Sequence, residues 1–149
     1  MTTSEPASAS VSLARFYARQ TRLLGTGDVE GWSETFAEDA VYEQRGRSDR
    51  VYARGASPAR RGRDQIASAA RGALADLAER GAVRKQWIDL VDVDTGPDGT
   101  VRAEYRTVIV QTGRDGGTSL HISAYGADVV VPDGERWLVT ERVLWHDDA

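Results

Sequence analysis

The residues best suited to proton transfer lie near the end of the chain. Residues 119–131 alternate on a period of two, so Ser119, His121, Ser123 and Tyr125 share one face of an expected strand, which Ala127, Val129 and Val131 continue. Histidine has the unperturbed pKa nearest neutrality and can both take and return a proton. A tyrosine hydroxyl beside it can donate to a carbonyl that becomes an enolate. The pattern indicates His121 as a general acid–base and Tyr125 as a carbonyl-polarising donor.

Two preceding strands are expected to add to this group. Folding the chain about Asp115 sets Tyr125 opposite Tyr105 and His121 opposite Ile109, and folding it near Pro97 brings Asp89 roughly opposite Tyr105. Tyr105 is then a second polarising donor, and Asp89 either orients His121 or acts as the base. The alternatives are structural: the histidine and the tyrosines could only line the cavity wall, and Asp89 could form an ion pair with Lys85 or Arg142.

These strands mix polar and apolar residues on both faces, which suits a sheet that curls around a partly polar cavity. Aromatic walls with a few convergent polar groups would bind a flat, hydroxylated small molecule. The residues expected to bind such a substrate come from the helices and strands around the cavity: Tyr17, Gln20, Trp32, Tyr42, Lys85, Trp87 and Arg142.

The composition narrows the class of protein. A chain of 149 residues without cysteine has no disulfide, thiolate metal site or cysteine nucleophile, and its net charge of −4 argues against non-specific nucleic-acid binding. His121 and His146 are the only histidines and lack ligand spacing, so we expect no metal, and without a phosphate loop or dinucleotide fingerprint we expect no cofactor. No run is long enough for a membrane span and no signal peptide is visible, which predicts a cytoplasmic protein.

The pattern of elements predicts an α+β fold. Helices are expected at residues 11–24, from Asp28 through Trp32 and Phe36, and from Arg63 to a C-cap at Gly81. A short strand is expected at 40–44, an arginine-rich loop at 45–62, and four strands at about 83–93, 100–112, 118–131 and 136–145. We expect residues 1–9 to be a disordered tail and residues 10–147 to form one domain.

This order, together with Gly27-Asp28 and the run Phe36-Ala37-Glu38-Asp39-Ala40, resembles the SnoaL-like branch of the nuclear transport factor 2-like superfamily. Further matching positions are Tyr125-Gly126, Asp128, Asp133-Gly134, Trp137 and Arg142. The resemblance implies a cone-shaped, curved antiparallel sheet wrapped around three N-terminal helices, also described as a cystatin-like α+β barrel. It also implies a homodimer formed through the convex side of the sheet, where we expect Leu120, Ile122, Val130, Trp137 and Val143.

The resemblance implies a cofactor-free cyclase, dehydratase or isomerase that acts on an aromatic or polyketide-like intermediate of antibiotic biosynthesis. The alternative is a non-catalytic binding or subunit-type domain, similar to the small subunit of a ring-hydroxylating dioxygenase. The chain departs from its relatives on one strand, where a frequent histidine and asparagine are replaced by Lys85 and Asp89. Ketosteroid isomerases share this fold, but their tyrosine and base fall on Gln20 and Gln44 here, so that chemistry is not expected.

Overall fold

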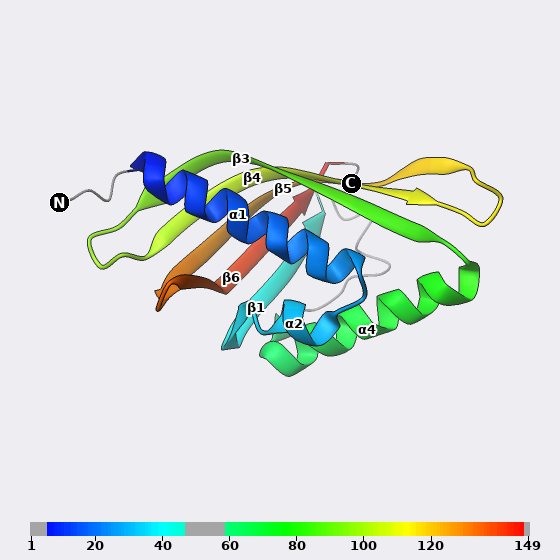
Figure 1. Cartoon of the computed structure of the whole chain (residues 1–149), viewed down its shortest axis with the longest axis horizontal. Helices are drawn as coiled ribbons and strands as arrows, with labels where there is room; N and C mark the ends of the chain where they lie inside the picture. The colour runs from blue at the N-terminus through cyan, green and yellow to red at the C-terminus, as the bar shows by residue number, and fades with distance from the viewer. Residues whose placement is uncertain (1–5, 47–58, 148–149) are drawn as a thin grey trace.

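Helices pack against one face of a curved sheet (Figure 1). The computed structural model describes residues 6–46 and 59–147. The helices are α1 (Pro6–Gly25), α2 (Val29–Ser33) and α4 (Arg63–Arg80). The strands are β1 (Phe36–Gly46), β2 (Arg60–Arg61), β3 (Val83–Thr95), β4 (Val101–Thr112), β5 (Thr118–Asp133) and β6 (Arg136–His146). The expected α+β class is confirmed.

The six strands form one sheet in the order β2-β1-β6-β5-β4-β3. β1 runs parallel to β6, and every other neighbouring pair is antiparallel. Figure 1 shows α1 lying across one face of this sheet, with α2 and the start of α4 below its C-terminal half in this view. We call the face toward the helices the inner face and the opposite one the outer face.

The helices begin and end where their local chemistry requires. The Asp28 carboxylate caps α2 by accepting a hydrogen bond from the Gly31 amide at 2.8 Å. α4 ends at Gly81, whose φ of 65° is the left-handed conformation that favours glycine. α1 begins at Pro6, inside the segment expected to be a disordered tail; residues 1–5 lie outside the described part of the chain.

The core lies between α1 and the inner face. One stripe of α1 is almost completely buried: Leu13, Phe16, Tyr17 and Gln20. Phe36 was expected to end the second helix, but it opens β1, and its ring packs edge-on against Trp32 with 4.8 Å between centroids. α2 therefore ends at Ser33, and β1 includes residues 36–39, ahead of the strand expected from residue 40.

The hairpin of β4 and β5 holds a one-residue bulge that decides which side chains face inward. Near the turn, Val110 pairs with Leu120 as folding about Asp115 requires. The register then shifts between Ile109 and Val110, so Ile109 pairs with Ile122 and His121 is the extra residue. Beyond the bulge Tyr105 lies opposite Gly126, and not opposite Tyr125 as expected. A slip of one residue exchanges the two faces of a strand.

The hairpin of β3 and β4 is also irregular. The register shifts between Leu90 and Asp92, which places Leu90 opposite Tyr105 and Asp89 opposite Arg106. The expected pairing of Asp89 with Tyr105 is therefore wrong by one position, and this shift also exchanges faces.

The outer face carries exposed apolar side chains. Val83, Trp87, Val108 and Leu120 are exposed by 59%, 54%, 37% and 62%. Leu120 was expected there, but Val130 is fully buried, and Ile122 and Trp137 pack against the core on the inner side.

The arginine-rich stretch is partly described. Residues 47–58 lie outside the described part of the chain, while Arg60 and Arg61 form β2 beside β1. Arg63 donates from Nε and Nη2 to the Phe36 carbonyl at 3.0 and 2.7 Å, which ties the start of α4 to β1. Within the described residues, no helix is long and apolar enough to cross a membrane.

Candidate functional site

A buried ion pair occupies the centre of the inner face. Asp128 on β5 lies directly opposite Arg142 on β6, and Arg142 Nη2 donates to Asp128 Oδ2 at 2.9 Å. Arg142 Nε lies 3.1 Å from Oδ1 and 3.2 Å from Oδ2. The Asp128 and Arg142 side chains are exposed by 0% and 6%. Charges removed from water to this extent require close pairing and further hydrogen bonds.

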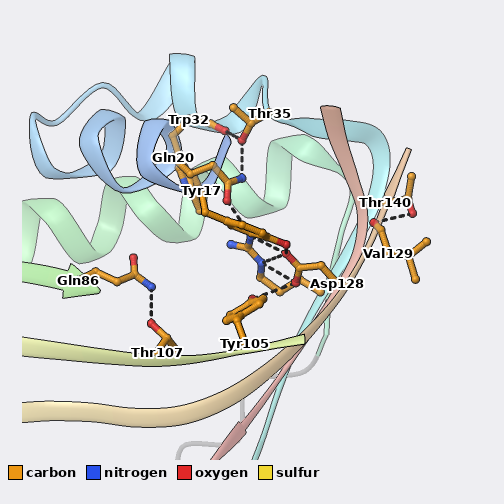
Figure 2. A network of polar contacts seen from close by, with 11 residues as sticks. Tyr17, Gln20, Trp32, Thr35, Gln86, Tyr105, Thr107, Asp128, Val129 and Thr140 are labelled. Carbon is orange, nitrogen blue, oxygen red and sulfur yellow. Dashed lines mark hydrogen bonds and ion pairs between the residues drawn. The ribbon is translucent and has the colours of Figure 1, made fainter. Parts of the chain in front are cut away.

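Two tyrosines supply those bonds to the carboxylate (Figure 2). Tyr17 of α1 donates to Asp128 Oδ2 at 2.7 Å, and Tyr105 of β4 donates to Oδ1 at 2.9 Å. Each carboxylate oxygen therefore accepts from one tyrosine and from the guanidinium. The carboxylate joins α1, β4, β5 and β6 at one point.

The network continues from Arg142 into the turn after α2. Arg142 Nη2 donates to Gln20 Oε1 at 2.8 Å, and Gln20 Nε2 donates to Thr35 Oγ1 at 2.7 Å. The Thr35 hydroxyl in turn donates to the Trp32 carbonyl. Among the described residues, no buried side-chain nitrogen or oxygen lacks a hydrogen-bond partner.

Aromatic rings surround the guanidinium and complete its environment. The Arg142 Cζ atom lies 5.1 Å from the centroid of Phe36, 5.7 Å from Tyr42, 5.9 Å from Tyr105 and 6.0 Å from Tyr17. Burial alone would lower the pKa of Arg142, but Asp128, Tyr105 and Tyr42 raise it well above its ordinary value. Arg142 therefore stays charged at any pH at which the protein folds.

Burial is the main cause that raises the pKa of the nearby tyrosines. It raises the pKa of Tyr17 and of Tyr42, and that of Tyr105 strongly, with the Asp128 charge adding to the rise in each case. Tyr17 and Tyr105 stay neutral because they donate to the Asp128 carboxylate, and Tyr42 stays neutral because it is buried near that charge. They are poor proton donors to a substrate as long as the network is intact.

Gly126 makes room for this arrangement. A Cβ atom at this position would lie closer than 3.0 Å to ring atoms of Tyr105. The Tyr105 ring thus crosses the backbone of the neighbouring strand and reaches Asp128. Any larger residue at 126 would displace the ring.

A pocket of about 270 Å³ opens beside the network, between α1, α4 and the β3–β4 part of the inner face. We call it the α1–α4 pocket. Its walls are mainly apolar and include Leu24, Ala70, Ala73, Leu74, Leu77 and Ile109. Its polar lining comes from Thr21 of α1 and from Arg84 and Gln86 of β3.

Hydrogen bonds fix the two polar residues of β3. Arg84 Nε donates to Gln111 Oε1 at 2.9 Å, and Gln86 Nε2 donates to Thr107 Oγ1 at 3.0 Å. Thr107 lies two residues from Tyr105 on the same face of β4, so the pocket adjoins the buried network (Figure 2).

A second, larger groove of about 830 Å³ lies between the first half of α1 and the β5–β6 hairpin. Its lining mixes charges of both signs, with Arg15, Arg19 and Arg136 against Glu34, Asp133 and Glu135. Neither one sign of charge nor apolar surface dominates it, so it is a weaker candidate for binding a small molecule.

The structure places five of the residues expected in the cavity outside it. Asp89 forms a long ion pair with Arg106 at 3.7 Å, and its side chain is 76% exposed. Tyr125 donates to Glu104 Oε1 at 2.7 Å on the outer face. His121, Lys85 and Trp87 are exposed. The expected meeting of His121 and Asp89 in a pocket is wrong, because the bulge at His121 and the shift at Val91 reverse the faces.

Other expected residues do converge. Tyr17, Gln20, Tyr105 and Arg142 belong to the buried network, and Trp32 and Tyr42 pack beside it. They surround a carboxylate that accepts from Tyr17, Tyr105 and Arg142, so in this structure their polar groups bond to one another.

Sequence reasoning missed the partners of these residues. Asp128 lies among valines and alanines, and the alternation that placed Tyr125 on the inner face predicted the outer face for Asp128. Gln86 and Thr107 carried no motif. His146, whose Nε2 lies 2.8 Å from Gln44 Oε1, is buried on the inner face. The signal available was charge complementarity between Asp128 and Arg142 on adjacent strands.

The stability of the fold should depend on the Asp128 charge. Asp128→Asn leaves Arg142 buried without its counter-ion and should cost about 3–5 kcal/mol of unfolding free energy. Asp89→Asn, the same change on the exposed face, should cost less than about 1 kcal/mol. Urea denaturation of both variants and the parent measures this. Equal losses in the two variants would contradict the central role of the pair.

The buried tyrosines should make the protein labile at high pH. Their folded pKa values lie above the value of 10.0 that an unfolded chain gives, so the unfolded state alone releases these protons. Unfolding free energy should fall above pH 10, by about 1.4 kcal/mol per pH unit for each such tyrosine. Tyr17→Phe should make this decline shallower in denaturation series across pH 9–11. An unchanged slope would show that Tyr17 ionises in the folded state.

Comparison with known structures shows the same fold in several bacterial proteins. The structure of Aln2 from a Streptomyces species superposes with a TM-score of 0.81 at 24% identity, over 99% of this chain and 96% of that one. A protein from Catenulispora acidiphila in complex with S-DNPA superposes with a TM-score of 0.73 at 24% identity, over 95% of this chain and 96% of that one. The beta subunit of a putative aromatic-ring-hydroxylating dioxygenase from Novosphingobium aromaticivorans superposes with a TM-score of 0.74 at 18% identity, over 96% of this chain and 92% of that one.

Among curated proteins, none matches the chain by sequence. The sequence profile of the SnoaL-like domain, however, matches residues 5–143. That match spans α1 through most of β6 and includes Asp128, Arg142 and the α1–α4 pocket. This chain therefore belongs to the SnoaL-like domain family.

Proposed function

We propose that this domain binds an aromatic or polyketide-like small molecule in the α1–α4 pocket and promotes its cyclisation or dehydration without a cofactor. The observation that carries the proposal is the pocket itself, which combines apolar walls from α1 and α4 with polar groups on the sheet. Small-molecule sites typically have this composition, with few polar groups that fix the orientation of the ligand.

The lining suggests what the pocket contributes to such chemistry. Its described residues offer a guanidinium at Arg84, an amide at Gln86 and a hydroxyl at Thr21, and include neither a carboxylate nor an imidazole. The Arg84 guanidinium can polarise a carbonyl and stabilise the negative charge of an enolate, and such electrostatic stabilisation often supplies the largest part of catalysis. The Thr21 hydroxyl already donates to the Ala18 carbonyl. The proposal thus moves the chemistry from His121 to an electrostatic site on β3.

The bound complex of the Catenulispora protein agrees with a small-molecule role, because a chain of the same fold holds S-DNPA. The apolar walls here would accept a flat ring system. A pocket of about 270 Å³ is near the lower end of the usual range for small-molecule sites, roughly 300–1,000 Å³, which favours a ligand of a few fused rings.

A second candidate is a domain that binds without catalysis, as in a dioxygenase subunit. The lack of a general base among the described pocket residues favours it, as does the closed ion-pair network that fills the centre of the inner face. Turnover of a bound aromatic ketone would support the enzyme, and tight binding without turnover would support the binding domain.

Ligand binding should depend on the space between α1 and α4. Ala73→Trp places a large ring in the pocket and should weaken binding of 2-naphthamide, a neutral aromatic probe, by roughly tenfold or more. Ala75→Trp makes the same change on α4 at an exposed residue outside the lining and should leave binding intact. Isothermal titration calorimetry measures both. Undiminished binding in Ala73→Trp would contradict the proposed site.

We also propose that the outer face forms a homodimer, because Trp87, Val108 and Leu120 expose apolar surface on neighbouring strands. Light scattering should give about twice the monomer mass of 16.2 kDa. Trp87→Glu should shift the species to the monomer, since a charge is costly in an apolar interface. Arg71→Glu, at an exposed residue of α4 away from the outer face, tests the change of charge alone. A parent protein that is monomeric at micromolar concentration would contradict the dimer.

A further inference from the structure

We propose that the ligand of the α1–α4 pocket is an anion, with a carboxylate or enolate oxygen bound by Arg84 and a hydrogen-bond donor that reaches Gln86. The inference rests on the proposed function and specifies its class of substrate: an apolar ring body with a negative group at one end.

Arg84 is placed to receive such a group. Its side chain lines the pocket, and its hydrogen bond to Gln111 uses Nε, which leaves the terminal nitrogens for another partner. Among the described residues no carboxylate forms an ion pair with it, in contrast to Arg80, which pairs with Asp76 at 3.1 Å. Since no buried nitrogen there lacks a partner, the terminal nitrogens are open to solvent and to a ligand.

The surroundings of Arg84 favour a negative partner over a neutral one. Partial burial is the main cause that lowers the pKa of Arg84; Arg80 lowers it further, and Asp76 opposes both. A half-buried guanidinium that forms no ion pair interacts more strongly with an anion than an exposed one does. Carboxylates and enolates also match the planar fork of donors that arginine presents.

The orientation of Gln86 defines the second contact. The Thr107 hydroxyl donates to the Trp87 carbonyl at 2.9 Å, so it can only accept from Gln86. This fixes the Gln86 amino group toward Thr107 and leaves its carbonyl oxygen as an acceptor. A hydroxyl or phenol on the ligand is the matching donor.

The spacing of the two contacts sets the size of the ligand. Arg84 and Gln86 lie two residues apart on the same face of β3, a separation of roughly 7 Å. A fused two-ring system spans this distance. We therefore expect the anionic group and the hydroxyl on opposite ends of such a ring system, with the rings between Leu74, Leu77 and Ile109.

The test compares 2-naphthoate with neutral 2-naphthamide, which share one ring body. By calorimetry, the parent should bind the naphthoate about 10- to 100-fold more tightly, as expected of a charge-assisted hydrogen bond. Arg84→Gln should abolish this preference while naphthamide binding persists, and Arg84→Lys should keep part of it. Arg80→Gln, the same charge change outside the lining, should keep the preference. Circular dichroism and thermal melting verify that each variant folds.

Equal affinities in the parent, or an unchanged preference in Arg84→Gln, would overturn the anionic class while leaving the proposed pocket intact. A preference lost equally in Arg80→Gln would also overturn it, because long-range charge and not contact would then explain the effect. If neither probe binds the parent, the pocket itself fails as the ligand site, and the inference fails with it.

Discussion

The structure depends on the ion pair of Asp128 and Arg142. Placing two charges in the core is costly, and their attraction offsets that cost only where every remaining lone pair and proton is satisfied. Tyr17, Tyr105 and Gln20 provide that satisfaction. The requirement fixes much of the fold at once, since α1 must present Tyr17 and Gln20 one turn apart, and β5 must bring Asp128 opposite β6. A core of apolar residues alone would tolerate shifts of α1 along the sheet that this network forbids.

The closed network also determines where function can lie. Cone-shaped folds of this kind invite the expectation of a site at the centre of the inner face. Here that centre holds a carboxylate with all its acceptor positions occupied, a guanidinium and three tyrosines, and no described pocket is lined by Asp128 or Arg142. The space that remains lies farther along the sheet, beyond Thr107, where small alanines of α4 face β3 and β4. The pocket therefore lies beside the network and is lined by none of its residues.

Much of the fold follows from the sequence. Apolar spacing in α1 and α4, the Asp28 cap and the glycine-rich turns place nearly every element within a few residues, because each signal is local. One exception is the boundary of α2 and β1, where Phe36 satisfies a helical and a strand pattern equally well. The others are the short strand β2, inside the segment expected to be a loop, and the start of α1 at Pro6. The candidate site was harder to predict, because it depends on pairing across strands. A single bulge at His121 exchanges the faces of β5, and no local pattern marks that bulge.

Asp128 illustrates the deeper reason. Alternation assigns a charged residue to the solvent face, and the same pattern places Asp128 on the face opposite the one expected for Tyr125 and His121. Asp128 is buried, so the rule that a charged residue faces solvent fails here. The burial of Asp128 can be predicted only when its partners on α1, β4 and β6 are known together. The same network then has a consequence for the pocket. Tyr105 is held by Asp128 and cannot shift along β4, so Thr107, two residues away, is held as well, and Thr107 orients Gln86. A polar contact at the pocket floor is thereby pre-organised by a structural ion pair, which lowers the entropy lost when a ligand binds.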